Sequence, residues 1–492
     1  MTASSRNILS AHLNKSGQFR YNRTSLALRQ KKSEIMKKVR INSKNVEKGD
    51  IFIAISSNKI TDHIEEAKRN GASLIFAEKL ASNLEGVIGI EDARLLASKM
   101  ARFIHSEQPE FCVAITGTNG KSSVAHFVRQ FWTSSGRKAA NLGTVGLFVD
   151  DDLTKTLDDI CIPDLTTPDQ FSLHQILEKL KSYEVNHFVF EASSHALQQK
   201  RLHSVSLSAA AFTNLESDHL DYHMTRDCYF KAKLKLFSEI LDPKSPAVVS
   251  RDFDDVYNGV TKYNKNIISF GMNSKNCITI EKIRNNASSI TFDLVLDGTK
   301  FKDIEVGLIG EFQLMNLMCS IGIAYCSGLD PHDIIEAMCK IRPLQGRMEL
   351  IKETNGIKIF VDYAHTSSAF EAALSAFKNI SKGKLICVFG CGGDRDKTKR
   401  REMGEIAGRL ADVVVVTDDN PRSEDPATIR EEIMLSCKKA IEIGDRKEAI
   451  KFSIRTALPG DHVVVMGKGH ETTQAYGSSV LDHSDQKEIL DN

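Results

Sequence analysis

A glycine-rich loop between an apolar run and a helical pattern is the feature that most constrains this fold. The run Phe111–Thr116 is apolar with β-branched residues and predicts a strand, and Ser122–Trp132 has the spacing of a helix. Between them the chain continues as Gly-Thr-Asn-Gly-Lys. Glycines let backbone N–H groups point at phosphate oxygens, and a helix N-terminus adds a positive dipole. The segment therefore predicts an α/β domain that binds a nucleotide.

Two side chains of this loop have predicted roles. Lys121 is expected to reach the β- and γ-phosphates, and the Ser122 hydroxyl to ligate Mg²⁺. The loop is not a regular Walker A sequence, because Ile115 stands where that pattern needs its first glycine. An ordinary strand–turn–helix junction is the alternative, and the Gly-Lys-Ser run favours the nucleotide. The predicted ATP contacts here are Gly117, Thr118, Asn119, Gly120, Lys121, Ser122 and Ser123.

Strand-like runs alternate with helical patterns along most of the chain, which predicts mostly parallel sheets with helices on both faces. We expect three α/β domains: a small N-terminal domain at 1–108, a central P-loop-type ATPase domain at 109–344 and a doubly wound, Rossmann-like C-terminal domain at 345–492. Residues 269–306 predict an antiparallel extension of the central sheet, and the stretch 145–162 contains an acidic polar loop. About the first 35 residues are polar, and we expect a loosely ordered extension there.

The composition excludes several classes of function. Lys and Arg number 65 against 64 Asp and Glu, so there is no basic surplus that would indicate a nucleic-acid partner. No window approaches the roughly 20 apolar residues of a membrane helix, and the polar N-terminus is not a secretory signal. Ten cysteines without a Cys-x-x-Cys motif predict a reduced chain. We expect a cytoplasmic monomer.

Acidic and histidine side chains follow two later strand-like runs. Glu191 ends the apolar run 187–191, where a carboxylate can face a γ-phosphate or cap the next helix. Thr213–His223 contains three acids and two histidines. Mg²⁺ prefers oxygen ligands, so residue chemistry alone makes His219 a hydrogen-bonding residue rather than a ligand. For the lysines between 231 and 235, spacing alone predicts a helix surface.

Together these motifs resemble those of the Mur ligase family of peptidoglycan synthesis, which also includes folylpolyglutamate synthase. The resemblance runs from Ile41 to Ala475 and rests on the 117–122 loop, Glu191-Ala-Ser-Ser-His, Asn214-Leu-x-x-Asp-His and Ala232-Lys233. It implies an ATP-dependent, Mg²⁺-requiring ligase that joins an amino acid to a carboxylate through an acyl-phosphate.

The resemblance also implies roles for individual residues. It implies catalytic roles for Lys121, Glu191, His219 and Lys233, and Mg²⁺ ligation by Ser122, Glu191, His219 and Lys233. Lys233 would act as a ligand after carbamylation, which turns an ammonium into a carboxylate. Further nucleotide contacts are implied for Asn316, Arg347 and Asp362. Contacts to the UDP-sugar or its peptide are implied for Ser43, Thr166, Thr167, Ser193, Gln199 and Arg201.

A four-residue motif, Asp419-Asn-Pro-Arg422, follows the apolar run Val413–Val416 and bears on the choice of amino acid. A guanidinium clamps a carboxylate bidentately, and diaminopimelate has a distal carboxylate that lysine lacks. Diaminopimelate-adding members of the family have this motif, whereas lysine-adding members typically lack its arginine. A turn with a helix cap is the alternative interpretation. The predicted diaminopimelate pocket comprises Arg395, Asp419, Asn420, Pro421, Arg422, Gly467 and Glu471.

These implied roles lead to one expected reaction, the ATP-dependent addition of meso-diaminopimelate to UDP-MurNAc-L-Ala-D-Glu. A lysine-adding Mur ligase and a folylpolyglutamate-synthase-like ligase are alternatives of the same class, and the segments 419–422 and 467–471 favour neither. A nucleotide-regulated scaffold that has kept the fold is the alternative from another class. The joint presence of Lys121, Glu191, His219 and Lys233 favours an enzyme over a scaffold.

Overall fold

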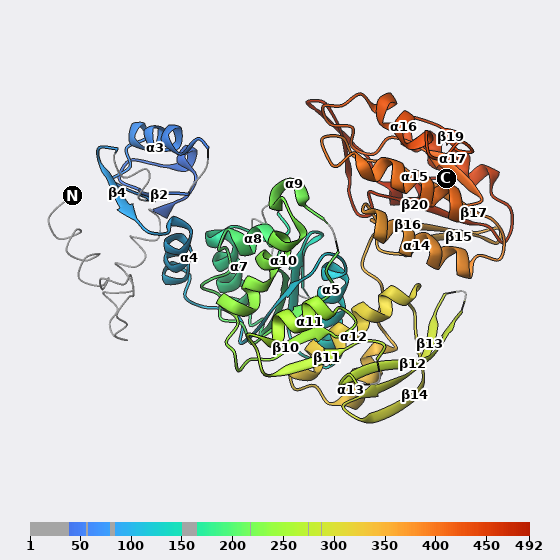
Figure 1. Cartoon of the computed structure of the whole chain (residues 1–492), viewed down its shortest axis with the longest axis horizontal. Helices are drawn as coiled ribbons and strands as arrows, with labels where there is room; N and C mark the ends of the chain where they lie inside the picture. Colours follow the sequence, from blue (N-terminus) through green and yellow to red (C-terminus); the bar gives the residue numbers. More distant parts are fainter. Residues whose placement is uncertain are drawn as a thin grey trace. The chain divides into compact units, whose positions relative to one another are not determined.

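The computed structural model describes residues 39–55, 58–78, 84–149, 165–216, 218–273, 275–286 and 288–492. The predicted N-terminal extension lies outside the described residues. The chain forms two compact units, Met1–Ile104 and His105–Asn492 (Figure 1). The three domain boundaries expected from the sequence stay predictions. No helix in the described ranges is long and apolar enough to span a membrane.

The first unit is built on a four-stranded parallel sheet in the order β1-β2-β3-β4. Its strands are β1 (Val39–Arg40), β2 (Ile51–Ala54), β3 (Leu74–Glu78) and β4 (Val87–Ile90), and its helices are α3 (Ile60–Arg69) and α4 (Ala93–Ile104). α3 is amphipathic, and its Ile64 and Ala67 pack with Phe52 and Ile75 in the core of this sheet. The small α/β unit expected from the sequence is confirmed.

The larger sheet of the second unit has the strand order β14-β13-β12-β11-β10-β9-β5-β8-β6-β7. Its strands are β5 (Phe111–Thr116), β6 (Ala139–Gly143), β7 (Gly146–Phe148), β8 (His187–Glu191), β9 (Ala209–Phe212), β10 (Ala247–Ser250), β11 (Ile267–Phe270), β12 (Ile278–Asn285), β13 (Ile290–Leu296) and β14 (Thr299–Val306). Neighbours from β6 to β12 pair in parallel. β12, β13 and β14 pair antiparallel, which confirms the predicted extension.

One short strand in this region was not predicted. β7 lies inside the stretch 145–162, which we expected to contain a loop, and it pairs antiparallel with β6. A three-residue edge strand is too short to show an alternating pattern in the sequence. The rest of the predicted loop, from residue 150, lies outside the described residues.

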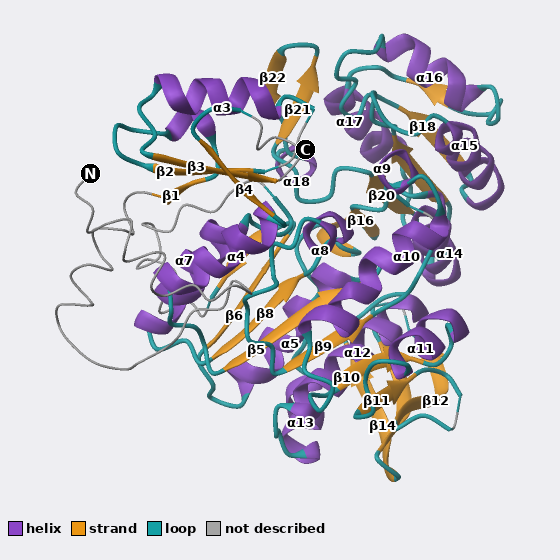
Figure 2. Ribbon diagram, turned by 60° about the vertical axis from the view of Figure 1, so that its left-hand side comes forward, coloured by secondary structure: helices purple, strands orange, loops and turns teal. Residues whose placement is uncertain are grey.

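Alternating residues of β5 face two separate cores. Val113 and Ile115 pack with α5 (Lys121–Ser134) and α12 (Glu311–Cys326), whereas Cys112 and Ala114 pack with α7 (Gln170–Ser182). Further helices on these two faces are α13 (Pro331–Met338), and α10 (Arg226–Lys235) with α11 (Asp254–Thr261). Figure 2 shows the orange strands with purple helices around them. A strand buried on both faces is apolar throughout, which is why β5 is a continuous apolar run in the sequence.

The second sheet of this unit has the order β15-β16-β20-β17-β18-β19. Its strands are β15 (Glu349–Thr354), β16 (Ile357–Asp362), β17 (Leu385–Phe389), β18 (Val413–Val416), β19 (Ile441–Glu442) and β20 (His462–Met466). All pairs are parallel except β15 with β16. One face packs on α14 (Ser367–Ile380), α15 (Thr398–Leu410) and α16 (Pro426–Met434), and the other on α17 (Arg446–Thr456) and α18 (Asp485–Leu490). The predicted doubly wound arrangement is confirmed.

Polar clusters follow the carboxyl ends of the parallel strands in both sheets, as the predicted site residues require. The phosphate loop follows β5 and Glu191 ends β8. In the second sheet, residues 390–397 follow β17, 418–422 follow β18 and 467–471 follow β20. Ligands of open α/β sheets bind beyond these strand ends.

Candidate active site

The loop between β5 and α5 has a backbone that only glycine allows at two positions. Gly117 and Gly120 have φ values of +144° and +84°. A Cβ on Gly117 would lie 1.9 Å from Thr213 Oγ1, and one on Gly120 would lie 2.1 Å from Asn316 Oδ1. The loop is therefore packed against the residues that follow β9 and against α12. Asn316, a predicted nucleotide contact, lies at the phosphate loop.

The N-terminus of α5 has no side-chain cap within the described structure, because Gly120 occupies the cap position. The neighbouring helices differ, since Asp169 caps α7 and Thr225 caps α10 through their side chains. Uncapped N–H groups at a helix start are donors for an anion. This end of α5 therefore suits a phosphate group, and the buried Ser123 lies in its first turn.

Lys121 is folded across its own loop. Its Nζ donates to the carbonyl oxygens of Gly117 and Thr118 at 3.0 and 2.8 Å. Burial lowers the pKa of Lys121, an effect opposed by the nearby carboxylate of Glu191. The ammonium thus has two carbonyl oxygens as partners, and a bound phosphate would compete with them for its hydrogen bonds.

Ser122 and Glu191 form the oxygen pair of the predicted metal site. Ser122 Oγ donates to Glu191 Oε1 at 2.7 Å, and Glu191 is 1% exposed. The backbone N–H of Thr144 donates to the same oxygen at 2.9 Å. A Cβ on Gly143 would lie 1.9 Å from Glu191 Oε1, so a glycine is needed at the end of β6. Gly143 ends β6 and Thr144 follows it, and neither residue was predicted from the sequence.

Lys233 is buried in the last turn of α10. It is 1% exposed, its Nζ donates to Gly117 O at 2.6 Å and it lies 4.4 Å from the centre of the Tyr229 ring. Burial lowers its pKa well below the ordinary value, and the positive charge of Lys121 lowers it further. The helix-surface interpretation that spacing suggested is therefore wrong for Lys233.

His219 has a half-exposed side chain, and its ring lies 6.2 Å from that of Tyr229, centre to centre. It has a positive φ of 52°, and its Nε2 lies 3.4 Å from Asp218 Oδ2. Its ring lies 5.1 Å from that of His195, centre to centre. Among the described residues, no three His, Cys, Asp or Glu side chains converge as a metal site. The oxygens of Ser122 and Glu191 nevertheless match the ligands that Mg²⁺ prefers.

Two polar residues that follow β9, Asn214 and Glu216, form hydrogen bonds with the phosphate loop. Asn214 accepts a hydrogen bond from Asn119 N through Oδ1 at 2.8 Å, and Glu216 accepts one from Asn119 Nδ2 at 2.7 Å. Thr118 N donates to Asn214 O at 3.0 Å. Sequence reasoning placed Asn214 and Glu216 in the histidine segment and did not foresee that they brace the loop.

The predicted contacts to the muramoyl peptide form one connected network. Thr167 Oγ1 donates to Glu191 O at 2.7 Å and lies 3.4 Å from Ser193 Oγ. Arg201 donates to Thr167 O, and its Nη2 donates to Gln199 Oε1 at 2.8 Å. Thr166 Oγ1 lies 3.1 Å from Thr144 Oγ1. The structure therefore joins Thr166, Thr167, Ser193, Gln199 and Arg201 to the surroundings of Glu191.

Ser43 belongs to the first unit, where it forms a separate polar cluster. It is 2% exposed, its Oγ donates to Glu66 Oε2 at 2.6 Å and lies 3.1 Å from His63 Nδ1. Asn70 Nδ2 donates to the Ser43 carbonyl at 3.1 Å. His63, Glu66 and Asn70 were not predicted, because α3 brings them to Ser43 only in the folded unit.

Asp362 and Arg347 lie at the carboxyl end of β16 and before β15. Asp362 is 5% exposed and accepts hydrogen bonds from Met348 N and Ala364 N, both at 2.8 Å. Burial raises its pKa, and Arg347 opposes that effect. The Arg347 guanidinium lies 4.1 Å from the centre of the Tyr363 ring. A partly exposed planar cation over an aromatic ring offers a stacking surface for a base.

The loops after β18 and β20 are joined by buried hydrogen bonds. Asn420 Nδ2 donates to Glu471 Oε2 at 2.9 Å, and Lys468 Nζ donates to the same oxygen at 2.8 Å. Burial alone would raise the pKa of Glu471, but Lys468 and Asn420 lower it overall. Gly467 has φ +107° and faces Asp419, whose Oδ2 would lie 2.9 Å from a Cβ there.

Arg422 reaches the loop after β17. It has φ +53°, and its Nη1 donates to Gly393 O at 2.7 Å. Pro421 lies against the same loop, since its carbonyl oxygen would be 1.9 Å from a Cβ on Gly393. Arg395 is exposed two residues further on. Six of the seven predicted pocket residues are thus joined by packing or hydrogen bonds, and Arg395 is connected to them through its loop.

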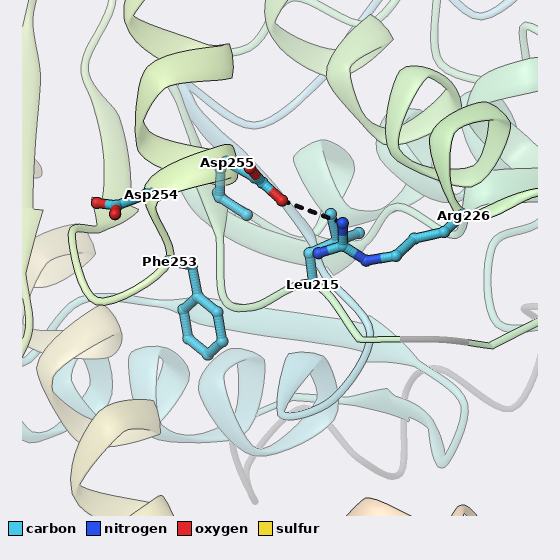
Figure 3. A pocket seen from close by; sticks show the side chains of 6 residues that line it. Leu215, Arg226, Phe253, Asp254 and Asp255 are labelled. Atoms are coloured by element: carbon cyan, nitrogen blue, oxygen red, sulfur yellow. Dashed lines mark hydrogen bonds and ion pairs between the residues drawn. The ribbon is translucent and has the colours of Figure 1, made fainter.

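A cavity of about 250 Å³ lies elsewhere in this unit, lined by Leu215, Arg226 and residues 253–256 (Figure 3). None of the predicted site residues lines it. Arg226 points toward Asp255 across the cavity and pairs with it at 3.0 Å. The predicted chemistry therefore lies at the strand ends rather than in this cavity.

Comparisons with known proteins agree with this arrangement. The Mur ligase middle domain matches residues 115–324, and the Mur ligase glutamate ligase domain matches 346–469. The UDP-N-acetylmuramoyl-L-alanyl-D-glutamate–2,6-diaminopimelate ligase of Agrobacterium fabrum is 39% identical over 453 residues, covering 91% of both chains. The protein of the same name from Rhizobium meliloti is 41% identical over 455 residues, covering 91% of this chain and 92% of its own.

Solved structures give the same result. A structure titled as a UDP-N-acetylmuramoyl-L-alanyl-D-glutamate–2,6-diaminopimelate ligase has a TM-score of 0.66 at 30% identity, over 92% of this chain and 94% of its own. A folylpolyglutamate synthase of Mycobacterium tuberculosis, complexed with ADP, has a TM-score of 0.63 at 16% identity over 76% of this chain and 91% of its own, which indicates a shared fold. With its phosphate loop, its fold and this similarity over nine-tenths of its length, the chain belongs to the Mur ligase family.

Proposed function

We propose that this protein adds meso-diaminopimelate to the γ-carboxylate of D-glutamate in UDP-MurNAc-L-Ala-D-Glu, with ATP as the energy source. The observation that most supports the choice of amino acid is the junction of the Asp419–Arg422 and Gly467–Glu471 loops through Asn420. Relatives that are named for this reaction match the chain over 91% of its length. The product would be a precursor of the peptidoglycan cell wall.

In the first proposed step, an oxygen of the γ-carboxylate attacks the γ-phosphorus of ATP in line. A carboxylate–phosphorus bond forms, the bond to the bridging oxygen breaks and ADP leaves. Lys121 turns from its carbonyl partners toward the transferring phosphoryl group and stabilises the charge that develops there. The backbone N–H groups in the first turn of α5 donate hydrogen bonds to the phosphates and also stabilise this charge.

In the second step, an amino group of diaminopimelate attacks the carbonyl carbon of the acyl-phosphate. A C–N bond forms, orthophosphate leaves and the nitrogen loses a proton. Ser122 and Glu191 would hold one Mg²⁺, and Glu191, His219 and carbamylated Lys233 a second. Bound Mg²⁺ would neutralise phosphate charge. Thr167, Ser193 and Arg201 would orient the peptide so that its carboxylate meets the phosphate.

The preference for diaminopimelate over lysine would come from Arg422. Its guanidinium is half-buried and partly engaged with Gly393 O, so it is held in one place. The distal carboxylate of diaminopimelate would complete the hydrogen bonds of this guanidinium, whereas bound lysine would leave the guanidinium without a charge partner. A bound distal carboxylate would bury this guanidinium, and loss of one partner of such a buried charged pair costs about 2–5 kcal/mol, which is enough to reject lysine.

We also infer a cytoplasmic location and a monomer. All nine cysteines in the described ranges are free, as expected of a reducing compartment where ATP and UDP-sugars are available.

The deciding experiment measures phosphate release with ATP, Mg²⁺ and UDP-MurNAc-L-Ala-D-Glu, comparing meso-diaminopimelate with L-lysine. We expect release with diaminopimelate only. Arg422→Ala should raise the KM for diaminopimelate by roughly 30-fold or more, the equivalent of about 2 kcal/mol, and leave the KM for ATP unchanged. Arg401→Ala is the matched control, because Arg401 is 80% exposed and pairs with Glu405 on its own helix. Release with lysine alone would keep the ligase but exclude the Arg422 clamp.

A further inference from the structure

One carboxylate outside the predicted pocket joins two of its loops. Glu424 lies just after the Asp419–Arg422 segment, and its Oε1 accepts a hydrogen bond from Asp394 N at 2.6 Å. Lys397 Nζ lies 3.0 Å from its Oε2. Asp394 and Lys397 both belong to the segment 390–397 after β17, here called the 390–397 loop. Glu424 thus connects the segment of one predicted pocket arginine with the loop of the other.

A buried arginine, Arg400, holds the carboxylate of Glu424 in place. Arg400, on α15, is 0% exposed, and its Nη2 and Nη1 donate to the two carboxylate oxygens of Glu424 at 2.8 and 3.1 Å. Its Nη1 also donates to Glu432 Oε2 at 2.7 Å. A bidentate arginine–carboxylate pair fixes direction as well as distance. Arg400 and the Asp394 amide lower the pKa of Glu424 to about 2, so the carboxylate is ionised at neutral pH.

The backbone at this junction is strained and closely packed. Asp394 and Arg422 both have φ values of +53°, which non-glycine residues rarely adopt. Such conformations are unfavourable and persist only where surrounding contacts determine them. Ser423 supplies a second contact, since its Oγ donates to Asp394 Oδ1 at 2.6 Å. Glu424 and Ser423 are therefore two of the contacts that hold this conformation, beside the bond from Arg422 to Gly393 O.

We propose that Glu424 is a positioning residue for recognition of the amino-acid substrate. By fixing the 390–397 loop against the segment after β18, it sets where Arg395 stands relative to Arg422. The ligand would be an amino acid with a second carboxylate, held by two cations whose spacing Glu424 determines. The identity of that ligand rests on the proposed function, whereas the ordering of the loop does not.

Glu424→Gln tests this role, because glutamine has the same shape but lacks the charge that binds Arg400 and Lys397. We expect the KM for meso-diaminopimelate to rise by roughly tenfold or more, with kcat and the KM for ATP unchanged within about twofold. Glu432→Gln is the matched control. Glu432 also binds Arg400, but it has no hydrogen bond or ion pair to the 390–397 loop within the described structure. The control should leave all three constants unchanged.

A second measurement needs no substrate. Hydrogen exchange of the backbone amides of residues 392–397 in the full-length protein should be faster in Glu424→Gln and unchanged in Glu432→Gln. A wild-type KM together with wild-type exchange in Glu424→Gln would overturn the proposal. A similar rise of the KM for ATP in Glu424→Gln would indicate general damage and overturn the proposal too. The same holds for a rise of the KM for diaminopimelate, or faster exchange, in Glu432→Gln. If the wild-type protein releases no phosphate with diaminopimelate, the proposed function fails, and the exchange still tests the loop.

Discussion

At the scale of single residues, burial distinguishes two lysines that look alike in the sequence. Lys231 is 71% exposed and pairs with Asp227 one turn away, whereas Lys233 is 1% exposed and contacts Gly117 O. Burial lowers the pKa of Lys233 well below its ordinary value, which favours the neutral amine. A neutral amine is nucleophilic, so this environment supports the proposed carbamylation with CO₂.

Lys233→Ala should reduce ligation by roughly 100-fold or more, the scale seen when one group that stabilises transition-state charge is lost. Short-chain carboxylic acids added to this variant should restore part of the activity, because they supply the missing carboxylate. Lys231→Ala, two residues away on the same helix, should retain wild-type phosphate release. Full activity in Lys233→Ala would remove this residue from the mechanism.

At the scale of elements, the two ends of α5 have glycines that matter in different ways. Gly120, before the helix, has φ +84° and faces Asn316 Oδ1 at a distance that a Cβ cannot occupy. Gly136, after the same helix, has φ +77°, and nothing would lie within 4 Å of a Cβ there. The left-handed conformation is shared, but only Gly120 is enclosed.

Gly120→Ala should therefore displace Asn316 or the loop and weaken ATP binding by roughly tenfold or more, measured by calorimetry with the full-length protein. Gly136→Ala is the control that introduces the conformational cost alone. That cost is about 1–2 kcal/mol of stability for a left-handed residue with a side chain. Its affinity for ATP should be unchanged while its melting temperature falls. Equal ATP affinities in the two variants would contradict the role assigned to the loop.

At the scale of the whole molecule, a buried ion pair ties the C-terminal helix to the amino-acid loops. Arg446 and Asp485 are 0% exposed on both side chains and lie 2.7 Å apart. Arg446 also donates to Met466 O at 3.0 Å and to Asp418 O at 3.3 Å, the residues at the ends of β20 and β18. α18 therefore supports the strand ends from which both pocket loops start.

Asp485→Ala should destabilise the folded chain by about 3–5 kcal/mol, because Arg446 would be left buried without its partner. Lys447→Ala removes the ion pair of a half-exposed lysine between the same two helices and should destabilise the chain much less. Thermal unfolding of the full chain separates the two outcomes. A loss in Asp485→Ala no greater than in Lys447→Ala would show that the buried pair does not support the fold.

The same pair predicts how stability depends on pH. Burial alone would raise the pKa of Asp485, but Arg446 and His483 hold it well below its usual range. A depressed carboxyl pKa contributes stability above the unfolded value of about 4, and that contribution is lost as the pH falls below it. The melting temperature of wild type should therefore fall from pH 5 toward pH 3 more steeply than that of Asp485→Ala.

The sequence by itself determined the class of fold, the phosphate loop and the family, because these depend on local patterns. Alternating apolar runs and helices require parallel sheets, and Gly117–Ser122 needs only its neighbours to form a loop. Tertiary structure alone decided that Lys233 is buried, that Gly143 and Thr144 flank Glu191, and that Glu424 joins two loops. These contacts unite residues far apart in the chain at shared strand ends, and burial, which sets their charges and pKa values, exists only once the sheets have packed.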